Sequence, residues 1–301
     1  MIELPITERT NENTAGLDRL STIAMLERIN EEDAGIAGAV RRELADVALA
    51  VDAVAAAYRA GGRLIYVGAG TSGRLGCLDA AECLPTFGVP PERVFGIIAG
   101  GERALLRAVE GAEDDADAGI AAIVAVEVSA ADAVVGISAS GGAPYVRGAL
   151  LEARRRGARV ISLANVPNAP LSADADIAIE VVTGPEVIAG STRLKAGTAQ
   201  KMVLNLISTG AMVRAGKTYG NRMVDVQATN AKLVRRSVRL IREIGNIDSD
   251  ESALHLLDQA GGSVKLAIVM ARLRLDPESA KAALDDAGGF LAVALGESDA
   301  R

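Results

Sequence analysis

Five short apolar runs alternate with segments of helical periodicity through the middle of the chain. A strand that is apolar along its whole length is typically buried on both faces of a sheet, and parallel strands need a long connection, usually a helix, between them. The alternation therefore predicts an α/β fold with a doubly wound, mainly parallel sheet of five strands. The expected strands are Leu64–Val67, Val94–Ala99, Ala133–Ser138, Arg159–Leu163 and Ile177–Val182.

Helices are expected before and after this sheet segment. Apolar residues recur at helical spacing between Asp18 and Ala60, which predicts two helices ahead of the first strand. After the last strand, a long helix is expected over 191–215 and a further one from Val226 to Ile244. Three short helical units follow at 252–260, 263–273 and 277–284.

These patterns predict a chain of three parts. Residues 1–60 are N-terminal helices that pack on the core, residues 61–246 are the sheet domain with its long helices, and residues 247–301 are a small three-helix module. A chain of 301 residues is long enough to bury a substantial core.

Composition disfavours several classes of partner. The net charge is −7 and aromatic residues make up 2% of the chain, whereas a nucleic-acid groove needs surplus cations and often aromatic rings for stacking. No apolar stretch approaches the roughly 20 residues of a membrane helix, and the first residues lack the features of a secretory signal. We therefore expect a cytoplasmic protein that binds neither nucleic acid nor a membrane. The only histidine, His255, is expected to be an ordinary helix residue rather than a member of a Ser-His-Asp triad.

A glycine- and hydroxyl-rich loop follows the first expected strand. Residues 63–82 read RLIYVGAGTSGRLGCLDAAE, where Gly70 permits a sharp turn while Thr71 and Ser72 offer hydroxyls and N–H groups at a helix N-terminus. This arrangement predicts a phosphate site. The loop also matches the G-x-G-x-x-G fingerprint of dinucleotide-binding proteins, but the second strand has no acidic residue at its end to hold a ribose. A nicotinamide or flavin site is therefore disfavoured, and no cofactor is expected.

A second loop of related chemistry follows the third expected strand. Ser138, Ser140 and Gly141 lie in the sequence SASGG, and Pro144 is placed to begin the next helix. Ligands of an open α/β sheet bind at the carboxyl ends of its strands, so the two loops are expected to converge on one anion, such as a sugar phosphate. The alternative, that small residues merely make tight turns, is weaker for two such loops than for one.

Two glutamates are candidate acid or base groups. Glu82 ends the segment that holds the first loop, and Pro85 is expected to end the helix there. Glu113 lies in AVEGAEDDADAG, an acidic cluster that by itself is typical of a solvated helix start. The cluster lacks the ligand spacing of an EF-hand, and no metal is expected.

A third group of candidates lies around the start of the long helix. Ser191 and Thr192 are expected at its N-terminus, and Arg193 and Lys195 in its first turn. The helix dipole disfavours cations in that turn, so their presence indicates a bound anion. Ordinary capping and surface charge are the alternative interpretation.

Four segments of the chain closely resemble the N-acetylmuramic acid 6-phosphate etherases. They read LSTIAMLERINEED, RLIYVGAGTSGRLGCLDAAECLPTFGVPPE, IAGGERALLRAVEGAEDD and GPEVIAGSTRLKAGTAQKMVLNLISTGAMVRAGKTYGNRMVDVQATNAKL, and the resemblance runs from about Leu4 to Glu243. It implies a sugar isomerase (SIS) domain and a homodimer. The implied reaction cleaves the D-lactyl ether of the sugar phosphate to N-acetylglucosamine 6-phosphate and D-lactate, without a metal, in the recycling of cell-wall sugars. It also implies a C-terminal bundle like that of ubiquitin-associated domains.

The resemblance assigns roles to residues named above. Glu82, in the D-A-x-E-C segment, and Glu113, in the E-G-A-E-D-D segment, match the acid/base glutamates of the family. The family's phosphate-binding hydroxyls correspond to Thr71, Ser72, Ser138, Ser140, Ser191 and Thr192.

The second loop departs from the family pattern. The family commonly has A-S-G-R-T-P-Y, whereas this chain has Gly142 and Ala143 in place of the arginine and the threonine. A guanidinium and a hydroxyl that can make charge-assisted hydrogen bonds are thereby lost. Arg74, Arg193 and Lys195 are candidates to replace the missing charge.

The ether chemistry suggests how the two glutamates act. Glu113 would remove the C2 proton of the open-chain sugar, and Glu82 would protonate the departing lactate oxygen and then activate a water, although the two roles can be exchanged. Two other functions are compatible with the same fold. One is a non-catalytic sugar-phosphate regulator, such as the vertebrate glucokinase regulatory protein, which is a larger tandem of such domains; the other is a sugar-phosphate isomerase. The presence of both glutamates favours catalysis over regulation.

Overall fold

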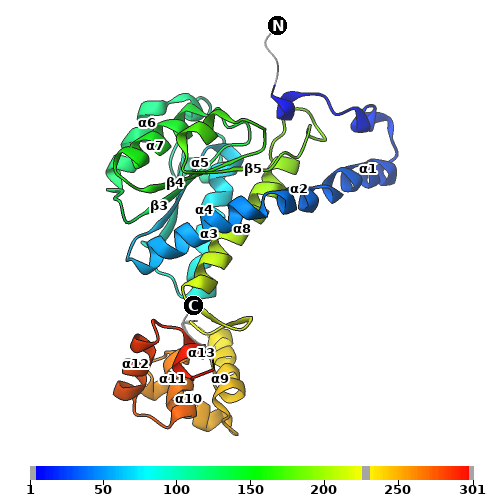
Figure 1. Ribbon diagram of the computed structural model, residues 1–301. Helices are drawn as coiled ribbons and strands as arrows, with labels where there is room; N and C mark the ends of the chain where they lie inside the picture. Colours follow the sequence, from blue (N-terminus) through cyan, green and yellow to red (C-terminus); the bar gives the residue numbers. More distant parts are fainter. Residues whose placement is uncertain (1–4, 226–230, 298–301) are drawn as a thin grey trace. The chain divides into compact units, whose positions relative to one another are not determined.

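A computed structural model describes residues 5–225 and 231–297 of the chain. The chain divides into two compact units, both drawn in Figure 1. The first unit is made of Met1–Ala81 and Glu92–Gly210, and the second of Glu82–Pro91 and Ala211–Arg301.

The first unit contains a five-stranded parallel sheet with the strand order β2-β1-β3-β4-β5. Every residue of β1 and of β3 is buried, as the apolar sequences of these strands predict. The predicted fold class is confirmed, and each strand lies within two residues of its expected bounds. The strands are β1 (Leu64–Gly68), β2 (Val94–Ile98), β3 (Ala133–Ile137), β4 (Arg159–Ala164) and β5 (Ile177–Glu180).

Helices cover both faces of this sheet, as Figure 1 shows. On one face lies α7 (Pro144–Arg155), whose Leu150 side chain packs against Gly136 of β3. On the other lies α4 (Gly70–Phe87), whose residue Gly76 packs against Tyr66 of β1. This two-sided cover is that of a doubly wound sheet. The first unit also contains α5 (Arg103–Leu106), α6 (Ala116–Ala125) and most of α8 (Lys195–Arg214).

Between Asp18 and Ala60, where two helices were expected, the structure has three α-helices. They are α1 (Thr22–Ala34), α2 (Ile36–Arg42) and α3 (Leu44–Arg59). Single residues, Gly35 and Glu43, separate them. The expectation of two helices was wrong because such short interruptions leave the apolar periodicity almost unchanged, so that two consecutive helices have the pattern of one.

Helix α4 does not end at Pro85 as expected. It continues to Phe87, with Pro85 inside its last turn. A proline so close to the end of a helix removes one N–H donor but leaves the earlier turns intact. The helix is closed instead by Gly88, which has a φ of 63° and donates its N–H to the carbonyl of Leu84 at 2.9 Å.

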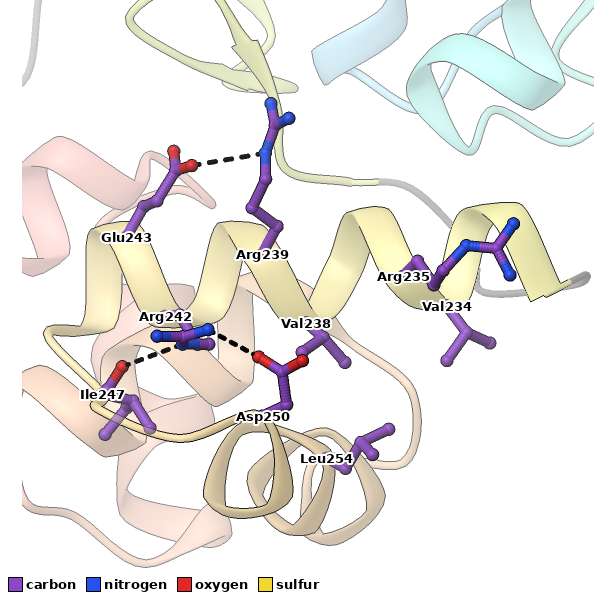
Figure 2. Close-up of a pocket in the computed structure, with 9 residues that line it drawn as sticks. All are labelled: Val234, Arg235, Val238, Arg239, Arg242, Glu243, Ile247, Asp250 and Leu254. Atoms are coloured by element: carbon purple, nitrogen blue, oxygen red, sulfur yellow. Dashed lines mark hydrogen bonds and ion pairs between the residues drawn. The ribbon is translucent and has the colours of Figure 1, made fainter.

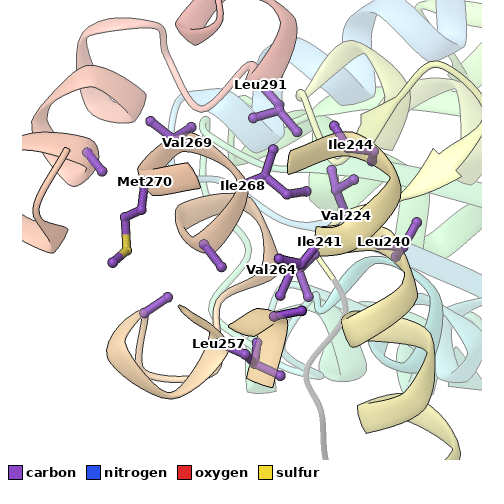
Figure 3. Close-up of a cluster of buried hydrophobic side chains, with 14 of the residues drawn as sticks. Val224, Leu240, Ile241, Ile244, Leu257, Val264, Ile268, Val269, Met270 and Leu291 are labelled. Carbon is purple, nitrogen blue, oxygen red and sulfur yellow. The ribbon is translucent and has the colours of Figure 1, made fainter. Parts of the chain in front are cut away.

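The second unit is built from helices around one apolar core. Figure 3 shows this core, in which Ile241, Ile268 and Leu291 are fully buried. The three short helices expected from the sequence are present as α10, α11 and α12, and α9 shares their core. The helix expected from Val226 begins outside the described residues. The elements are β6 (Thr218–Tyr219), β7 (Arg222–Met223), α9 (Ala231–Gly245), α10 (Asp250–Gln259), α11 (Val264–Leu273), α12 (Pro277–Asp286) and α13 (Leu291–Ala294).

The limits predicted for the three parts of the chain stay a prediction. The observed division groups α9 with the C-terminal helices, whereas the expected limit lies after α9. In neither unit do the described residues include a helix that is long and apolar enough to cross a membrane.

A buried carboxylate ties α4 to its neighbours within the first unit. Asp79 of α4 is 6% exposed. It accepts hydrogen bonds from Tyr66 Oη at 2.8 Å, Asn205 Nδ2 at 2.6 Å and Ser208 Oγ at 3.2 Å. One donor comes from β1 and two come from α8, so this carboxylate joins three elements. Buried polar groups are tolerated in a core when they are hydrogen-bonded in this way.

Two glycines allow α4 to begin directly at the end of β1. A Cβ atom on Gly73 would lie 2.7 Å from the carbonyl oxygen of Gly68 and 2.6 Å from Cγ1 of Ile98. A Cβ atom on Gly68 would lie 2.6 Å from the backbone nitrogen of Gly73. A side chain at either position therefore forces the strand and the helix apart.

We expect Gly73→Ala to lower the free energy of unfolding by about 1–3 kcal/mol, because the added methyl group overpacks the junction of β1 and α4. Gly38→Ala is the matched control, since Gly38 lies in α2 and a Cβ atom added to it would have no neighbouring atom within 4 Å. The control should be neutral or stabilise by up to about 1 kcal/mol, as alanine favours helix. Urea unfolding followed by circular dichroism measures both, and equal effects would contradict the steric argument.

Candidate active site

The two hydroxyl-rich loops lie side by side at one edge of the sheet. β1 and β3 are adjacent parallel strands, so the loops that begin at Ala69 and Ser138 leave the same edge. From β1 the chain passes to β2 on one side and then to β3 on the other. This is the point at which the strand order reverses, where open α/β sheets usually bind their ligands.

In the first loop, the Ser72 hydroxyl takes part in a buried chain of hydrogen bonds. Ser72 Oγ donates to Gln200 Oε1 at 3.0 Å, and Gln200 Nε2 donates to Asn165 Oδ1 at 2.9 Å. Asn165 Nδ2 in turn donates to the carbonyl of Val181 at 3.0 Å. A hydroxyl has one proton, so Ser72 in this arrangement is an acceptor toward a ligand, and its backbone N–H is the donor left for an anion. Its phosphate-binding role stays a prediction.

The rest of the first loop is more accessible than Ser72. Gly70 is exposed and has a φ of 53°, a left-handed conformation that glycine adopts without strain. Thr71 follows it and is half-buried at the start of α4. This part of the loop therefore presents backbone N–H groups and a hydroxyl at a helix N-terminus, as the sequence predicts.

The second loop is closed by its own hydrogen bonds. The N–H of Gly141 donates to the carbonyl of Ser138 at 3.0 Å, and the N–H of Gly142 donates to Ser140 Oγ at 3.3 Å. Gly141 has a φ of 68°, and a Cβ atom on it would lie 2.5 Å from Cβ of Ala169, so only glycine fits. Pro144 begins α7 as predicted.

A small cavity of about 180 Å³ connects the first loop with the segment that precedes α6. Gly70 and Arg74 line it from the first loop and α4, and Glu113 lines it from the other segment. The structure therefore brings one predicted catalytic residue next to the predicted phosphate loop. Glu110 also lines the cavity and was not identified from the sequence, although it lies three residues before Glu113 in the same acidic segment.

The acidic residues around Glu113 differ in their environment. Asp115 is the N-cap of α6, and its carboxylate accepts a hydrogen bond from the N–H of Ala118 at 2.9 Å. This part of the cluster is the ordinary helix start that the sequence indicated. Glu113 is exposed in a short 3₁₀ turn, Ala112–Asp114, that begins after Gly111 with a φ of 71°. Its side chain is left available at the cavity.

The other predicted catalytic residue, Glu82, is exposed on α4. It belongs to the second compact unit, whereas Glu113 belongs to the first. Its catalytic role stays a prediction from the family resemblance.

The candidates near α8 have a different environment from the one expected. α8 begins at Lys195, so Ser191 and Thr192 precede its N-terminus by a few residues. Arg193, expected in the first turn, lies in the turn before the helix, and that expectation was wrong. Lys195 is buried, and its Nζ donates to Glu32 Oε2 at 2.6 Å and to the carbonyl of Pro185 at 3.0 Å. The Glu32 carboxylate thus balances the positive charge of Lys195, which a bound anion was expected to balance. The ligand-binding roles of Ser191, Thr192 and Lys195 stay predictions.

A second buried carboxylate caps α8. Glu186 is fully buried, and its two carboxylate oxygens accept hydrogen bonds from the N–H groups of Lys195 at 2.8 Å and Ala196 at 2.9 Å. Burial raises the pKa of Glu186 above its ordinary value, although both hydrogen bonds act in the opposite direction. The N–H groups of the first two residues of α8 are therefore hydrogen-bonded to Glu186, and the lysine charge is balanced by Glu32.

The Glu32 carboxylate joins α1 to this region. Burial alone would raise its pKa, but the hydrogen bonds that it accepts and the positive charge of Lys195 outweigh burial, and the pKa falls to about 2. A carboxylate whose pKa is lower in the folded state than in the unfolded state stabilises the fold most at pH values above its unfolded-state pKa.

We expect Glu32→Gln to lower the free energy of unfolding at pH 7 by roughly 3 kcal/mol, because it leaves the buried Lys195 ammonium without its carboxylate. The difference from the unsubstituted chain should shrink as the pH falls from about 4.5 toward 2, where Glu32 takes up its proton. Glu31→Gln is the control, since the Glu31 side chain is 70% exposed and its oxygen Oε2 lies 3.4 Å from Nε of Arg28, which is itself 46% exposed. It should change the free energy by less than about 1 kcal/mol. Urea unfolding between pH 2.5 and 7 measures both; indistinguishable variants would refute the role of Glu32.

A hollow in the second unit is lined by paired charges and apolar side chains. It measures about 590 Å³ and lies between α9 and α10, as Figure 2 shows. Its charged residues mostly pair with one another: Arg242 Nη1 lies 2.7 Å from Asp250 Oδ1, and Arg239 Nε lies 3.3 Å from Glu243 Oε1. No residue predicted for the site lines it. Among residues 5–225 and 231–297, no three side chains of His, Cys, Asp or Glu are placed to hold a metal ion.

Comparison with known proteins identifies the family. Two family profiles match: the glucokinase regulatory protein N-terminal SIS domain over residues 46–154 and the SIS domain over residues 116–209. An N-acetylmuramic acid 6-phosphate etherase of Gloeobacter violaceus is 54% identical over 290 residues, which are 96% of this chain and 94% of that protein. An etherase of the same name from Edwardsiella ictaluri is 51% identical over 98% of both chains. The chain belongs to the N-acetylmuramic acid 6-phosphate etherase family.

The family assignment confirms the resemblance seen in the sequence. Its SIS domain accounts for the sheet and for the loops at the carboxyl ends of β1 and β3. A solved phosphoheptose isomerase from Francisella tularensis has a TM-score of 0.51 and 18% identity to this etherase-family chain, covering 64% of this chain and 100% of the isomerase. That likeness shows a shared fold.

Proposed function

We propose that the protein cleaves the D-lactyl ether of N-acetylmuramic acid 6-phosphate to give N-acetylglucosamine 6-phosphate and D-lactate. The observation that carries this proposal is the identity of 51–54% with etherases over nearly the whole chain. The cavity supports it, because Glu113 lies there beside the glycine loop expected to hold a phosphate. The reaction is proposed to take place in the cytoplasm, in the recycling of cell-wall sugars.

The first chemical step is proposed to be an elimination. In the open-chain sugar, the C1 aldehyde makes the C2 proton acidic, and Glu113 takes that proton. The electron pair forms a C2–C3 double bond while the C3–oxygen bond breaks, and Glu82 gives a proton to the departing oxygen, so that D-lactate leaves. Water then adds its oxygen to C3 and a proton to C2, which gives the hydroxyl of the product sugar. Glu82, now a carboxylate, is the proposed base for this water.

The sugar phosphate is proposed to bind through the loops that follow β1 and β3. Exposed Gly70 and half-buried Thr71 offer N–H and hydroxyl donors at the N-terminus of α4, where the helix dipole favours an anion. Ser140 of the second loop is half-buried at the same sheet edge. Ser72 contributes a backbone N–H, because its hydroxyl proton is directed to Gln200.

We expect Glu113→Gln and Glu82→Gln each to lower kcat for D-lactate release by about 10²–10⁴-fold, the usual contribution of a general acid or base. The roles are separated in heavy water: Glu82→Gln should still exchange deuterium at C2, whereas Glu113→Gln should not. Enzymatic detection of D-lactate and mass spectrometry of the sugar measure the two events. Normal D-lactate release by both variants would falsify the proposal.

The same assay distinguishes the alternatives. A regulator of the glucokinase regulatory protein type would bind the sugar phosphate without releasing D-lactate, and an isomerase would change the sugar and keep the lactyl group. The expected result is D-lactate in amounts equal to the N-acetylglucosamine 6-phosphate formed.

A homodimer is proposed for this protein, and α1 offers a surface for it. All thirteen residues of α1 are described, and none of them is buried. Ile23 is 65% exposed and Leu26 is 51% exposed, and Leu20, just before the helix, is 43% exposed. The spacing of three places these apolar side chains along one side. An exposed apolar stripe on a helix is typical of a surface that is covered by another protein chain.

We expect Ile23→Lys combined with Leu26→Lys to convert a dimer into a monomer, because two charges would be buried in an apolar interface. Sedimentation velocity at micromolar concentration measures the state. Glu27→Lys with Glu31→Lys, which reverses two charges on exposed residues of the same helix, should leave the dimer intact. A dimer that persists in the first double variant would place the interface elsewhere.

A further inference from the structure

We propose that Arg74 binds the carboxylate of the lactyl group, and so selects sugar phosphates that carry the lactyl ether over those that do not. This inference rests on the proposed etherase function and names the residue that recognises the part of the substrate to be removed. The cavity of about 180 Å³ carries it, because Arg74 and Glu113 line the same cavity from different segments.

The Arg74 guanidinium is held in place on one side only. Its Nε donates to the carbonyl of Leu105 at 3.2 Å, which fixes the plane of the group. In the described part of the chain no carboxylate forms an ion pair with Arg74, so its two terminal nitrogens remain as donors. A guanidinium that presents two such donors matches the two oxygens of a carboxylate.

The location of Arg74 within α4 also favours an anionic partner. It is the fifth residue of α4, and the first turn of this helix holds no acidic residue that could balance its charge. The carboxylates that share its cavity, those of Glu110 and Glu113, are exposed and form no ion pair with it among the described residues. An arginine that lies near acidic groups without forming an ion pair with them is suited to hold a substrate carboxylate next to a catalytic base.

The substrate carries two anions, and their positions decide which of them Arg74 meets. Glu113 is proposed to act at C2, and the lactyl group is attached to the adjacent carbon, C3. The phosphate is on C6, three carbons further along the sugar. Gly70 of the first loop lines the same cavity as Arg74 and Glu113. If the loop N–H groups hold the phosphate on C6, Arg74 is left as the donor for the carboxylate attached at C3.

The test compares substrate and product as ligands, because N-acetylglucosamine 6-phosphate differs from the substrate in lacking the lactyl group. Binding is measured by calorimetry in full-length chains that carry Glu113→Gln, so that the substrate is consumed only slowly during the measurement. Adding Arg74→Gln should weaken the binding of N-acetylmuramic acid 6-phosphate by about 10–100-fold, the range of a charge-assisted pair. The binding of N-acetylglucosamine 6-phosphate should change less than about threefold.

Two further variants complete the design. Arg154→Gln is the matched control: Arg154 is exposed near the C-terminal end of α7, which runs away from the carboxyl edge of the sheet, and it should leave both affinities unchanged. Arg74→Lys keeps the charge but not the paired donors, and should cause an intermediate loss for the substrate alone. If Arg74→Gln does not fold by circular dichroism, the lysine variant provides the comparison.

The outcomes separate this inference from the proposed function. Equal weakening of both ligands means that Arg74 contacts the phosphate or the sugar, and unchanged binding of both means that it contacts neither; each result overturns the inference. Failure of the proposed function would be recognised by a different result: the unsubstituted chain would release no D-lactate. Selective weakening of the lactyl-bearing ligand supports the inference.

Discussion

The close approach of β1 and α4 is the constraint on which the candidate site depends. A strand that ends within van der Waals contact of the first helical turn leaves no room for side chains, and only Gly68 and Gly73 allow the approach. The loop between them is therefore short, and α4 begins directly at the carboxyl end of β1. The second loop, which leaves the same edge after β3, is closed by Gly141 under a similar steric limit.

Much of the fold was predictable because its signals are local. Parallel strands buried on both faces have continuous apolar sequences, and all five were located to within two residues. Helix ends were less predictable, because they depend on single residues. Gly35 and Glu43 interrupt the N-terminal helices without changing the apolar period, and Pro85 lies inside the last turn of α4 instead of ending it.

The candidate site was predictable only where residue type indicates chemistry. Glycines and hydroxyls after two strands indicated the loops, and the family resemblance selected Glu113 from an acidic cluster. The partners of these groups were not predictable, since they come from distant parts of the chain. Lys195 meets Glu32, which is 163 residues away, and Ser72 meets Gln200, which is 128 residues away. The positive charge of Lys195 and the hydroxyl proton of Ser72 were both expected to be available to a ligand. In the structure, each is bound by a side chain of the protein.

The three hydrogen bonds to Asp79 have a consequence for how the protein meets a ligand. They join α4 to β1 and α8, so sliding or rotating α4 would leave a carboxylate buried without its donors. The helix is therefore confined to one position before any ligand arrives. The loop at the N-terminus of α4 is therefore ordered when the protein folds, and a ligand that binds there does not have to order it. The N–H donors of the loop are in place before the ligand binds.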